Sequence, residues 1–528
     1  MKPTLPLFAA LLLTPLAALH AADAPPPKKP NVLFIAIDDL KPLLGCYGTS
    51  WIKSPAIDRL AQQGTLFTSS YCRVPLCAPT RVSLLTGLSP DSTGVYFNPF
   101  KVKNVLRRHM PEVVTLPQYF KNNGYITCAM GKVFDSRTVD AGHDSVSWSL
   151  PFVNQHQFTP SGPGVRGYQN PETQERLKKA TKESTRNPLA GPPTECRDVP
   201  DNAYLDGAMA RTAVAEIKEL AQQPQPFFLA VGFHKPHLPF IAPKKYWDLY
   251  DRAALPIAAF QSFPFGSPPE AQVVPNSGEL RDYAGVPKSG PIPEAQQREL
   301  INGYAACVSY IDAQVDLLVK ALEESGIAEN TIICLWGDHG WHLGEHGHWG
   351  KSTDYEDATR VPLIIRAPNV GKGVRTASLT ELLDVYPTLC DLAGLPKPTH
   401  LQGKSLAPIL HNPKTQIHEA AISQCSTVDS QMSPQLVGGQ LDELATIESQ
   451  MGWTLRTPRF RYVEWREAKL TDNKQVFGTK VLGVELYDYQ TDPLEHENLA
   501  GKTEFAAVLK EQQALFDKLL PHLPKRER

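Results

Sequence analysis

The sequence has no excess of charge of either sign. Its 528 residues include 53 Lys and Arg against 55 Asp and Glu, which gives a net charge of −2. A nucleic-acid-binding surface normally needs a basic excess, so this balance gives no sign of a nucleic-acid partner. An anionic substrate must therefore be held by local groups.

The sequence also lacks an apolar run of the ~20 residues that a membrane-spanning helix needs. At the N-terminus, Lys2 precedes an apolar stretch from Leu7 to Leu19 and small residues at Ala21 and Ala22. This pattern predicts a cleaved signal peptide at residues 1–22, and a membrane anchor is the alternative. The leader has no Cys for lipidation, so we expect a secreted or periplasmic protein with no stable membrane insertion.

Cysteine is scarce and its number is odd. In an exported chain with nine cysteines, at least one must be unpaired. Cys128, Cys334 and Cys390 lie in apolar stretches, where a small buried hydrophobic role is favoured over a disulfide.

Three continuous apolar runs, at residues 31–37, 226–233 and 331–336, each end in polar residues. Runs without alternation are typical of strands buried on both faces of a parallel sheet. Apolar residues spaced by three or four between Tyr304 and Leu322 predict a helix between two of these strands. We therefore expect an α/β fold with a large, mostly parallel sheet flanked by helices, and ligands at the carboxyl ends of its strands.

The length of the chain exceeds what one hydrophobic core usually supports. Residues 150–202 and 252–296 are rich in Pro, Gly and Ser, which predicts two long surface loops. From about residue 416 the pattern changes to short strand-like segments with a final helix near 503–520. These changes predict a catalytic domain at 31–415 and a smaller C-terminal α+β subdomain at 416–528.

Acidic residues follow two of the predicted strands. The adjacent carboxylates of Asp38 and Asp39 repel each other unless a cation lies between them, although a turn or helix-cap role for one is an alternative. Asp338 and His339 follow another predicted strand and are natural partners at the same sheet edge. Three carboxylates favour Ca²⁺ or Mg²⁺ over zinc, while His339 leaves a transition metal or a purely structural histidine as alternatives.

The segment Cys77-Ala-Pro-Thr-Arg81, followed by Thr86-Gly87, resembles the C-x-P-x-R signature of the formylglycine-dependent sulfatase family. This resemblance implies an alkaline-phosphatase-like fold and a maturation enzyme that oxidises Cys77 to formylglycine. The hydrated aldehyde carries two hydroxyls, of which one attacks sulfur and the other later loses its proton so that sulfate is expelled. A serine has no second hydroxyl.

Further segments resemble the iduronate-2-sulfatase branch of this family, and the similarity runs with gaps from residue 31 to about 500. They are residues 38–48, 131–134, 232–240, 337–347, 451–456 and 485–488. The resemblance implies that one calcium ion is held by Asp38, Asp39, the modified Cys77, Asp338 and His339. It also implies that the sulfate is surrounded by Arg81, Lys132, His234 and Lys351.

The implied roles suit these residue types. The fixed fork of donors on Arg81 can brace the hydrated aldehyde and neutralise the anion. Lys132 and Lys351 supply point charges, and His234 would protonate the leaving sugar oxygen.

One position departs from the family pattern. After Gly131-Lys-Val-Phe134 the family has a histidine that assists elimination from formylglycine, whereas this chain has Asp135. Asp135 can still accept a proton, and His143 is an alternative for that role.

Substrate contacts are less constrained by the motifs. Lys235 and His237 lie beside His234, and Trp341, His342 and His348 follow the predicted metal ligands. We expect these residues to line the cleft and bind a uronate carboxylate, with packing roles as the alternative for some of them.

The expected function is exo-acting hydrolysis of a 2-O-sulfated uronate in a carbohydrate, with the maturation enzyme as a second partner. The alternatives are a sulfatase on another sulfated polysaccharide, for example an algal one, and a phosphonate or phosphate ester hydrolase of the same superfamily. A catalytically silent glycan-binding protein with an unmodified Cys77 is the alternative outside the enzymes.

Overall fold

The computed structural model describes residues 29–98, 104–158, 167–183, 191–272, 278–427, 447–471 and 474–527. The predicted signal peptide lies outside the described residues. Among the helices that are described, none combines the length and apolar character needed to cross a bilayer.

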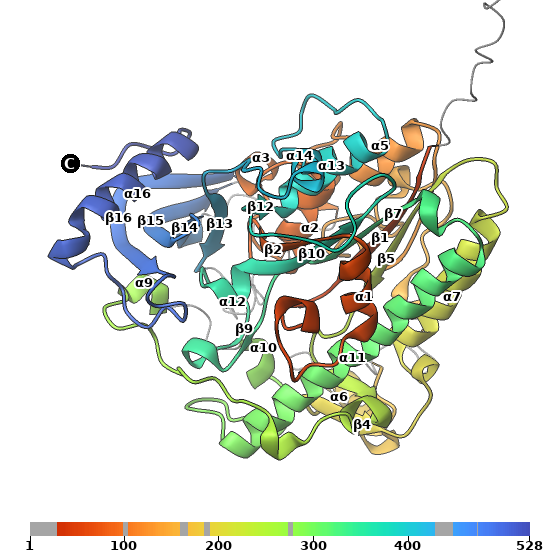
Figure 1. Cartoon of the computed structure of the whole chain (residues 1–528). Coiled ribbons are helices and arrows are strands. Elements are labelled where there is room, and N and C mark those ends of the chain that lie inside the picture. The colour runs from red at the N-terminus through yellow and green to blue at the C-terminus, as the bar shows by residue number, and fades with distance from the viewer. Residues whose placement is uncertain are drawn as a thin grey trace, which may run out of the picture.

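A mixed sheet forms the centre of the molecule, with strand order β11-β2-β10-β7-β1-β5-β3 and with β12 paired to β2 (Figure 1). Its parallel half consists of β7 (Thr331–Gly337), β1 (Asn31–Ile37), β5 (Phe227–Phe233) and β3 (Ile126–Gly131). The other half consists of β10 (Arg360–Arg366), β2 (Thr65–Tyr71), β11 (Val374–Thr376) and β12 (Thr380–Glu381). In that half β10 runs antiparallel to both of its neighbours. The three predicted strands are confirmed as β1, β5 and β7.

The strand β1 shows why continuous apolar runs predicted a sheet buried on both faces. Leu33, Ile35 and Ile37 belong to one hydrophobic core, whereas Val32, Phe34 and Ala36 belong to the other. The first core is covered by α1 (Pro55–Gln63), α7 (Leu205–Leu220) and α11 (Glu294–Glu324). The second is covered by α2 (Cys77–Thr86), α5 (Leu116–Asn122) and α13 (Val385–Leu392). The predicted helix at Tyr304 to Leu322 is thus confirmed as part of the longer α11.

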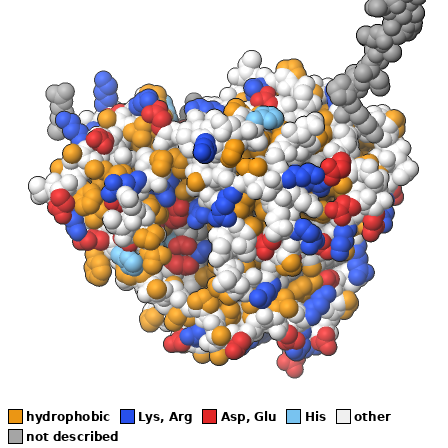
Figure 2. All heavy atoms as spheres, viewed as in Figure 1, with side chains coloured by type: hydrophobic (Ala, Val, Ile, Leu, Met, Phe, Trp, Pro, Cys, Tyr) orange, Lys and Arg blue, Asp and Glu red, His pale blue; other side chains and the backbone are white. Residues whose placement is uncertain are grey.

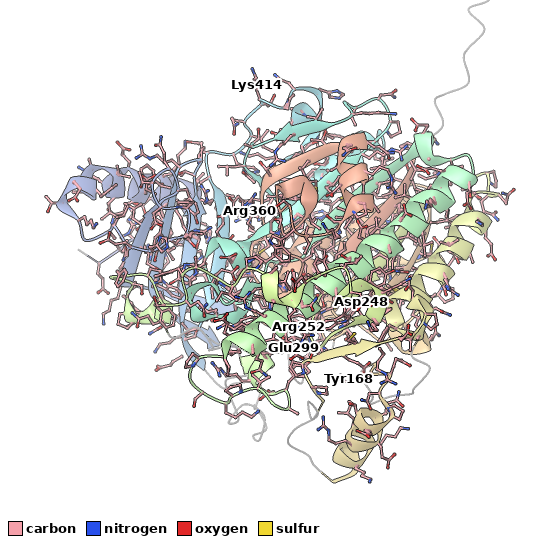
Figure 3. All side chains as sticks on the ribbon, turned by 60° about the horizontal axis from the view of Figure 1, so that its bottom comes forward. Tyr168, Asp248, Arg252, Glu299, Arg360 and Lys414 are labelled. Atoms are coloured by element: carbon pink, nitrogen blue, oxygen red, sulfur yellow. The ribbon has the colours of Figure 1, made fainter. Side chains whose placement is uncertain are left out.

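The expectation of two long loops is wrong in part, because both segments contain regular structure. The segment 150–202 includes α6 (Pro171–Glu183) and β4 (Thr194–Arg197), which pairs in parallel with β6 (Phe240–Pro243). Figure 3 brings this side forward, with Tyr168 near α6 and Glu299 of α11 near β4, where Glu299 accepts a hydrogen bond from Thr194. The second segment includes α9 (Pro269–Gln272) and α10 (Gly278–Arg281). These pieces are short or polar, so they carry little apolar periodicity.

The remaining elements are short and connect the larger ones. They are α3 (Pro90–Thr93), α4 (Val105–His109), α8 (Lys244–Trp247), β8 (His342–Leu343), β9 (Trp349–Gly350), α12 (Glu356–Thr359) and α14 (Ala407–His411). Single 3-10 turns lie at 45–47, 145–147, 155–158, 201–203, 252–254, 328–330, 345–347, 382–384 and 503–505.

A second, antiparallel sheet lies beside the first and forms the C-terminal part of the chain (Figure 1). It consists of β13 (Ala421–Ser426), β14 (Ile447–Arg456), β15 (Phe460–Thr471) and β16 (Lys474–Asp488). The helix α16 (Ala506–Leu519) packs on it through Phe516, whose ring centroid lies 5.7 Å from that of Tyr462. This arrangement agrees with the α+β pattern predicted for the C-terminal region.

All nine cysteines lie in described residues and none is in a disulfide. Cys128, Cys334 and Cys390 are buried among apolar side chains, as expected. The core is therefore held together without covalent crosslinks.

The buried carboxyl of Glu485 predicts a specific pH dependence of stability. Burial raises its pKa from 4.5 to about 7. Between these values the folded state keeps a proton that the unfolded state has lost, so raising the pH in this window destabilises the fold. We expect the melting temperature of the wild type, relative to that of Glu485→Gln, to fall as the pH rises from 5 to 8.

Differential scanning fluorimetry at several pH values measures this difference. Glu467→Gln, which changes an exposed glutamate of β15, is the matched control. A wild-type-minus-E485Q difference that stays constant from pH 5 to 8 would contradict the raised pKa.

Candidate active site

The ends of the four parallel strands carry most of the predicted site residues. Asp38 follows β1, Asp338 follows β7, Lys132 follows β3, and His234 follows β5. Because these strands are neighbours and parallel, their carboxyl ends meet at one edge of the sheet. The site is thus assembled by topology from residues far apart in the sequence.

The turn that carries Lys132 lies directly against β5. Gly131 has a φ of 75°, and a Cβ at Gly232 would lie 2.2 Å from the backbone carbon of Lys132. The two glycines therefore allow the ends of β3 and β5 to approach closely, with the Lys132 amide donating to the Gly232 carbonyl at 2.8 Å.

Arg81 lies fully buried between two of the carboxylates. Its Nη2 donates to Asp38 Oδ1 at 3.0 Å, and its Nε donates to Asp338 Oδ2 at 2.9 Å. Its Nη1 donates to the carbonyls of Lys132 and Val133. Arg81 is thus a fixed cation that joins the ends of β1, β3 and β7.

Burial and the neighbouring cations act in opposite directions on the pKa values of the three carboxyls. Burial alone would raise the pKa of Asp38, but Lys132, His237 and Arg81 outweigh it and hold that pKa well below its usual value. Burial raises the pKa of Asp39 well above its usual value, against the opposing charge of Lys351. Burial also raises the pKa of Asp338 to about 6, although Arg81 opposes it. Each carboxylate of the cluster contacts a cation: Asp38 contacts Arg81 and Lys132, Asp338 contacts Arg81, and Asp39 contacts Lys351.

Asp39 adopts a left-handed backbone conformation with a φ of 58°. Its amide donates to Asp338 Oδ1 at 3.0 Å, and its carbonyl accepts from the hydroxyl of Tyr304 at 2.8 Å. These two contacts, one from the residue after β7 and one from α11, fix a turn that a non-glycine residue seldom adopts.

His339 presents one ring nitrogen to the cluster. Its Nδ1 donates to the Gly340 carbonyl at 2.9 Å, which leaves Nε2 unprotonated. Nε2 lies 3.3 Å from Cys77 Sγ and 3.3 Å from Asp39 Oδ1. Burial lowers the pKa of His339 well below its usual value, so this ring is neutral and offers a lone pair to a cation.

Cys77 is the first residue of α2, and every residue of this helix is buried. Lys132 Nζ lies 3.4 Å from Cys77 Sγ, and Lys351 Nζ lies 3.5 Å from it. The same two ammonium groups contact Asp38 Oδ2 at 2.5 Å and Asp39 Oδ1 at 2.7 Å. Burial, with Asp38 beside it, raises the pKa of the Cys77 thiol.

The Thr86-Gly87 pair of the signature ends α2. Gly87 has a φ of 70°, and its amide donates to the Ser83 carbonyl at 2.8 Å. The Thr86 hydroxyl donates to the Val82 carbonyl at 2.7 Å. This pair therefore defines the helix that carries Cys77 and Arg81.

The donor set at the cluster fits a hard divalent cation. Ligand atoms of Asp38, Cys77, Asp338 and His339 all lie within 4.8 Å of one another, as do those of Asp38, Asp39, Cys77 and His237. Asp39 Oδ2 is buried and has no hydrogen-bond partner in the described chain. Three carboxylates with a neutral imidazole nitrogen favour an oxygen-preferring ion such as Ca²⁺ or Mg²⁺.

Asp206, in the first turn of α7, positions the segment after β5 and was missed by the sequence reasoning. Its two carboxylate oxygens accept from the amides of His234 at 2.7 Å and Lys235 at 3.1 Å. His234 Nδ1 is buried without a partner in the described chain. Burial, reinforced by Lys132, lowers the pKa of His234 well below its usual value.

The structure gives Lys235 and His237 different surroundings. Lys235 Nζ donates to the carbonyls of His237 at 2.6 Å and Pro239 at 2.8 Å, so it braces its own loop. His237 Nε2 lies 3.4 Å from Glu279 Oε1, and the other oxygen of Glu279 lies 3.9 Å from Lys351 Nζ. Glu279, in a segment predicted as a loop, was also missed.

The carboxylate of Asp135 forms an ion pair with an arginine two residues further on. Arg137 Nε donates to Asp135 Oδ1 at 2.8 Å, and Arg137 Nη2 donates to Asp135 Oδ2 at 2.6 Å. Burial alone would raise the pKa of Asp135, but the hydrogen bonds and charge of Arg137 hold it well below its usual value. His143, the alternative for the same role, stacks on Phe152 with a ring-centroid distance of 3.8 Å.

The residues after His339 divide between the site and the core. The ring of the buried Trp341 lies 5.2 Å from Lys351 Nζ and so supports that ammonium group. His342 and His348 lie instead in a buried aromatic cluster, with 5.4 Å between their ring centroids. His342 also hydrogen-bonds to Thr353 at 2.8 Å. These two histidines serve packing, which was the alternative predicted for them.

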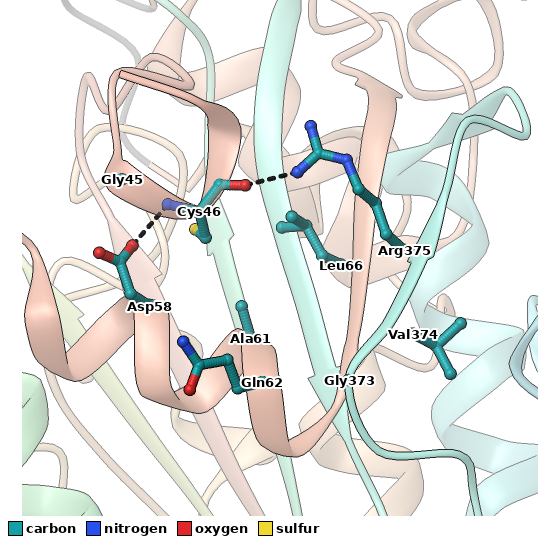
Figure 4. A pocket seen from close by; sticks show the side chains of 9 residues that line it. All are labelled: Gly45, Cys46, Asp58, Ala61, Gln62, Leu66, Gly373, Val374 and Arg375. Atoms are coloured by element: carbon teal, nitrogen blue, oxygen red, sulfur yellow. Dashed lines mark hydrogen bonds between the residues drawn. The ribbon is translucent and has the colours of Figure 1, made fainter. Parts of the chain in front are cut away.

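A separate pocket of about 350 Å³ lies between α1 and the edge strand β11 (Figure 4). Its one lining guanidinium, Arg375, donates to the Cys46 carbonyl at 2.7 Å, and Asp58 accepts from the Cys46 amide at 2.6 Å. Its charged groups are thus already paired. On the face shown in Figure 2, acidic and basic side chains are interspersed.

The chain is similar to known proteins over most of its length. The protein-family model described as Sulfatase matches residues 30–395. Iduronate 2-sulfatase of Mus musculus is 32% identical over 532 aligned residues, covering 91% of this chain and 92% of that protein.

Two solved structures show the same architecture. A 2-O GAG sulfatase superposes with a TM-score of 0.65 at 25% identity, over 94% of this chain and 92% of that one. A phosphonate monoester hydrolase from Silicibacter pomeroyi superposes with a TM-score of 0.68 at 22% identity, over 94% and 96%, and so shares the fold alone. These matches confirm the predicted alkaline-phosphatase-like α/β fold.

Proposed function

The chain belongs to the sulfatase family, and from this premise we propose that it removes the 2-O-sulfate of a uronate at the non-reducing end of a carbohydrate. The observation that carries the proposal is the position of Cys77 Sγ, within 3.5 Å of two ammonium groups and beside the carboxylate cluster. The similarity to an iduronate 2-sulfatase and to a 2-O GAG sulfatase supports the uronate as substrate.

We propose that Cys77 is converted to formylglycine by a maturation enzyme. The aldehyde hydrate at position 77 would supply the nucleophilic hydroxyl and the second hydroxyl that releases sulfate. We also propose that one Ca²⁺ is held by Asp38, Asp39, Asp338, His339 and residue 77. The ion would lower the pKa of the attacking hydroxyl and withdraw charge from the sulfate oxygens.

Lys132, Lys351 and Arg81 supply the positive charge for the sulfate group. Each is buried or nearly so, and each already contacts a carboxylate of the cluster, so their positions are fixed before substrate binds. Preorganised cations in a site that excludes water stabilise developing negative charge more strongly than mobile ones.

His234 is the proposed donor of a proton to the leaving sugar oxygen. Asp206 fixes its backbone, and its unpartnered Nδ1 shows that the ring is not held by another described side chain through that atom. Burial makes the ring neutral in the free protein, and an adjacent sulfate anion favours its protonated form when substrate binds.

Substitution of His234 by glutamine tests this role. We expect kcat for the sulfated uronate to fall by about 10²- to 10⁴-fold, because an alkoxide leaving group needs a proton. For 4-nitrophenyl sulfate, whose leaving group is stable as an anion, we expect a loss of less than about tenfold. Equal losses on both substrates, measured by sulfate release, would contradict a general-acid role.

The substrate itself is tested with defined disaccharides. Purified, matured protein is incubated with saturated and unsaturated 2-O-sulfated uronate disaccharides and with 6-O- and N-sulfated isomers, and released sulfate is measured by ion chromatography. We expect release from the 2-O-sulfated compounds only. Activity confined to another sulfated sugar, or faster hydrolysis of an aryl phosphonate than of an aryl sulfate, would overturn the proposal.

The remaining predictions concern the whole chain. We propose that residues 1–22 are removed as a signal peptide on export to the periplasm or medium. We also propose residues 31–415 as the catalytic domain and residues 416–528 as the C-terminal subdomain.

A further inference from the structure

The pair formed by Asp135 and Arg137 lies at the edge of the active site. Asp135 is 2% exposed and follows the turn of Lys132, whose backbone carbonyl accepts from Arg81. The side chain of Arg137 is 40% exposed and is held by Asp135 through two parallel hydrogen bonds. A buried carboxylate thus fixes an accessible guanidinium beside the sulfate-binding lysine.

The guanidinium of Arg137 is a cation held in place by Asp135. Burial alone would lower its pKa, but the hydrogen bonds and charge of Asp135 raise it. Within the described chain no residue accepts a hydrogen bond from its Nη1. Arg137 therefore keeps donor capacity for a ligand.

The lysines at this site already contact other groups of the protein. Lys132 and Lys351 have side chains 12% and 9% exposed, and both contact the carboxylate cluster and Cys77. The ammonium group of Lys235 donates hydrogen bonds to two backbone carbonyls. The side chain of Arg137, which is 40% exposed, is more accessible than those of Lys132 and Lys351.

The environment of His237 also disfavours a second anion there. Glu279 lies 3.4 Å from its Nε2 and 3.9 Å from Lys351 Nζ. A substrate carboxylate placed beside His237 would therefore be repelled by the carboxylate of Glu279. An acidic group on the substrate is therefore better accommodated on the side of Arg137. The planar fork of an arginine matches a carboxylate, and ionised donors and acceptors form the stronger hydrogen bonds.

Building on the proposed function, we propose that Arg137 binds the carboxylate of the uronate while the sulfate lies at residue 77. Asp135 is then a positioning residue that orients Arg137. This role takes the place of the proton-accepting role that the sequence predicted for Asp135. The substrate is recognised through two anionic groups, each at its own cation.

The test compares a 2-O-sulfated uronate disaccharide with the same compound after reduction of its carboxylate to a hydroxymethyl group. We expect the wild type to prefer the carboxylate form by about 10- to 100-fold in kcat/KM, the range of one charge-assisted hydrogen-bond pair. Arg137→Gln should abolish this preference, mainly by raising KM for the carboxylate form. Its activity on 4-nitrophenyl sulfate, which has no carboxylate, should stay within about threefold of the wild type.

Two further variants separate binding from structure. Asp135→Asn keeps the arginine but weakens its anchor, so it should reduce the preference partially. Arg211→Gln changes an exposed arginine of α7 and should change nothing.

The inference is overturned if R137Q loses activity equally on all three substrates, or if the wild type does not discriminate the two disaccharides. A wild type that releases sulfate from other sugars but from neither disaccharide refutes the proposed substrate instead.

Discussion

Replacing Cys77 by alanine is expected to lower sulfate release by about 10⁴-fold or more, the scale seen when a covalent nucleophile is removed. The side chain begins α2 at the point where Lys132, Lys351 and the carboxylate cluster meet. No other described residue occupies that point. Turnover of a sulfated uronate and of an aryl sulfate, measured with folded protein of matched concentration, gives the result.

Two controls define what the loss means. Cys128→Ala removes a buried cysteine of β3 outside the cluster and should leave kcat unchanged, although cavity formation should lower stability. Cys77→Ser restores one hydroxyl but not two, so it should not restore turnover. A C77A variant with more than about a tenth of wild-type activity would rule out residue 77 as nucleophile.

Removal of divalent cations is expected to have the second-largest effect. A chelator should lower activity by about 10²-fold or more, because an ion that polarises the sulfate contributes several kcal/mol. The melting temperature should also fall, since the buried carboxylates of Asp38, Asp39 and Asp338 then repel one another. Added Ca²⁺ should restore both properties.

The matched control for this effect is Asp312→Asn. Asp312 is a buried carboxylate outside the cluster, and its oxygens accept from the amides of Ala56 and Ile57 at the start of α1. The variant should be less stable but should respond to chelator and Ca²⁺ as the wild type does. A wild type that keeps its activity and melting temperature after elemental analysis confirms metal removal would contradict the calcium proposal.

The sequence predicted the residues at strand ends well because parallel topology brings them together without further information. Continuous apolar runs identified β1, β5 and β7, and the polar residues after each run meet at one edge of the sheet. The Thr86-Gly87 pair could be read as part of a signature, and the structure gives its physical role as the end of α2.

Residues that do not follow a predicted strand could not be predicted in the same way. Glu279 lies in a segment without periodicity, and its proximity to His237 depends on tertiary folding alone. Asp206 had no motif around it. Arg137 had a weak signal, since it stands two residues from Asp135, the one position that departs from the family pattern.

The histidines after His339 illustrate the limit of motif context. Four histidines occur within ten residues of the sequence. His339 was predicted as a metal ligand, and His342 and His348 were expected to line the cleft. Their assignment depended on strand β8 and on the packing of Tyr355, whose ring centroid lies 4.2 Å from that of His346. Of these four histidines, only His339 has a nitrogen within the carboxylate cluster.

The mass of the tryptic peptide that contains residue 77 tests the central claim most directly. The protein should be purified from its native host or co-produced with a formylglycine-generating enzyme. The account predicts a peptide that has lost one sulfur and two hydrogens and gained one oxygen, as an aldehyde or its hydrate. An active sulfatase whose residue 77 is present only as the unmodified thiol would contradict it.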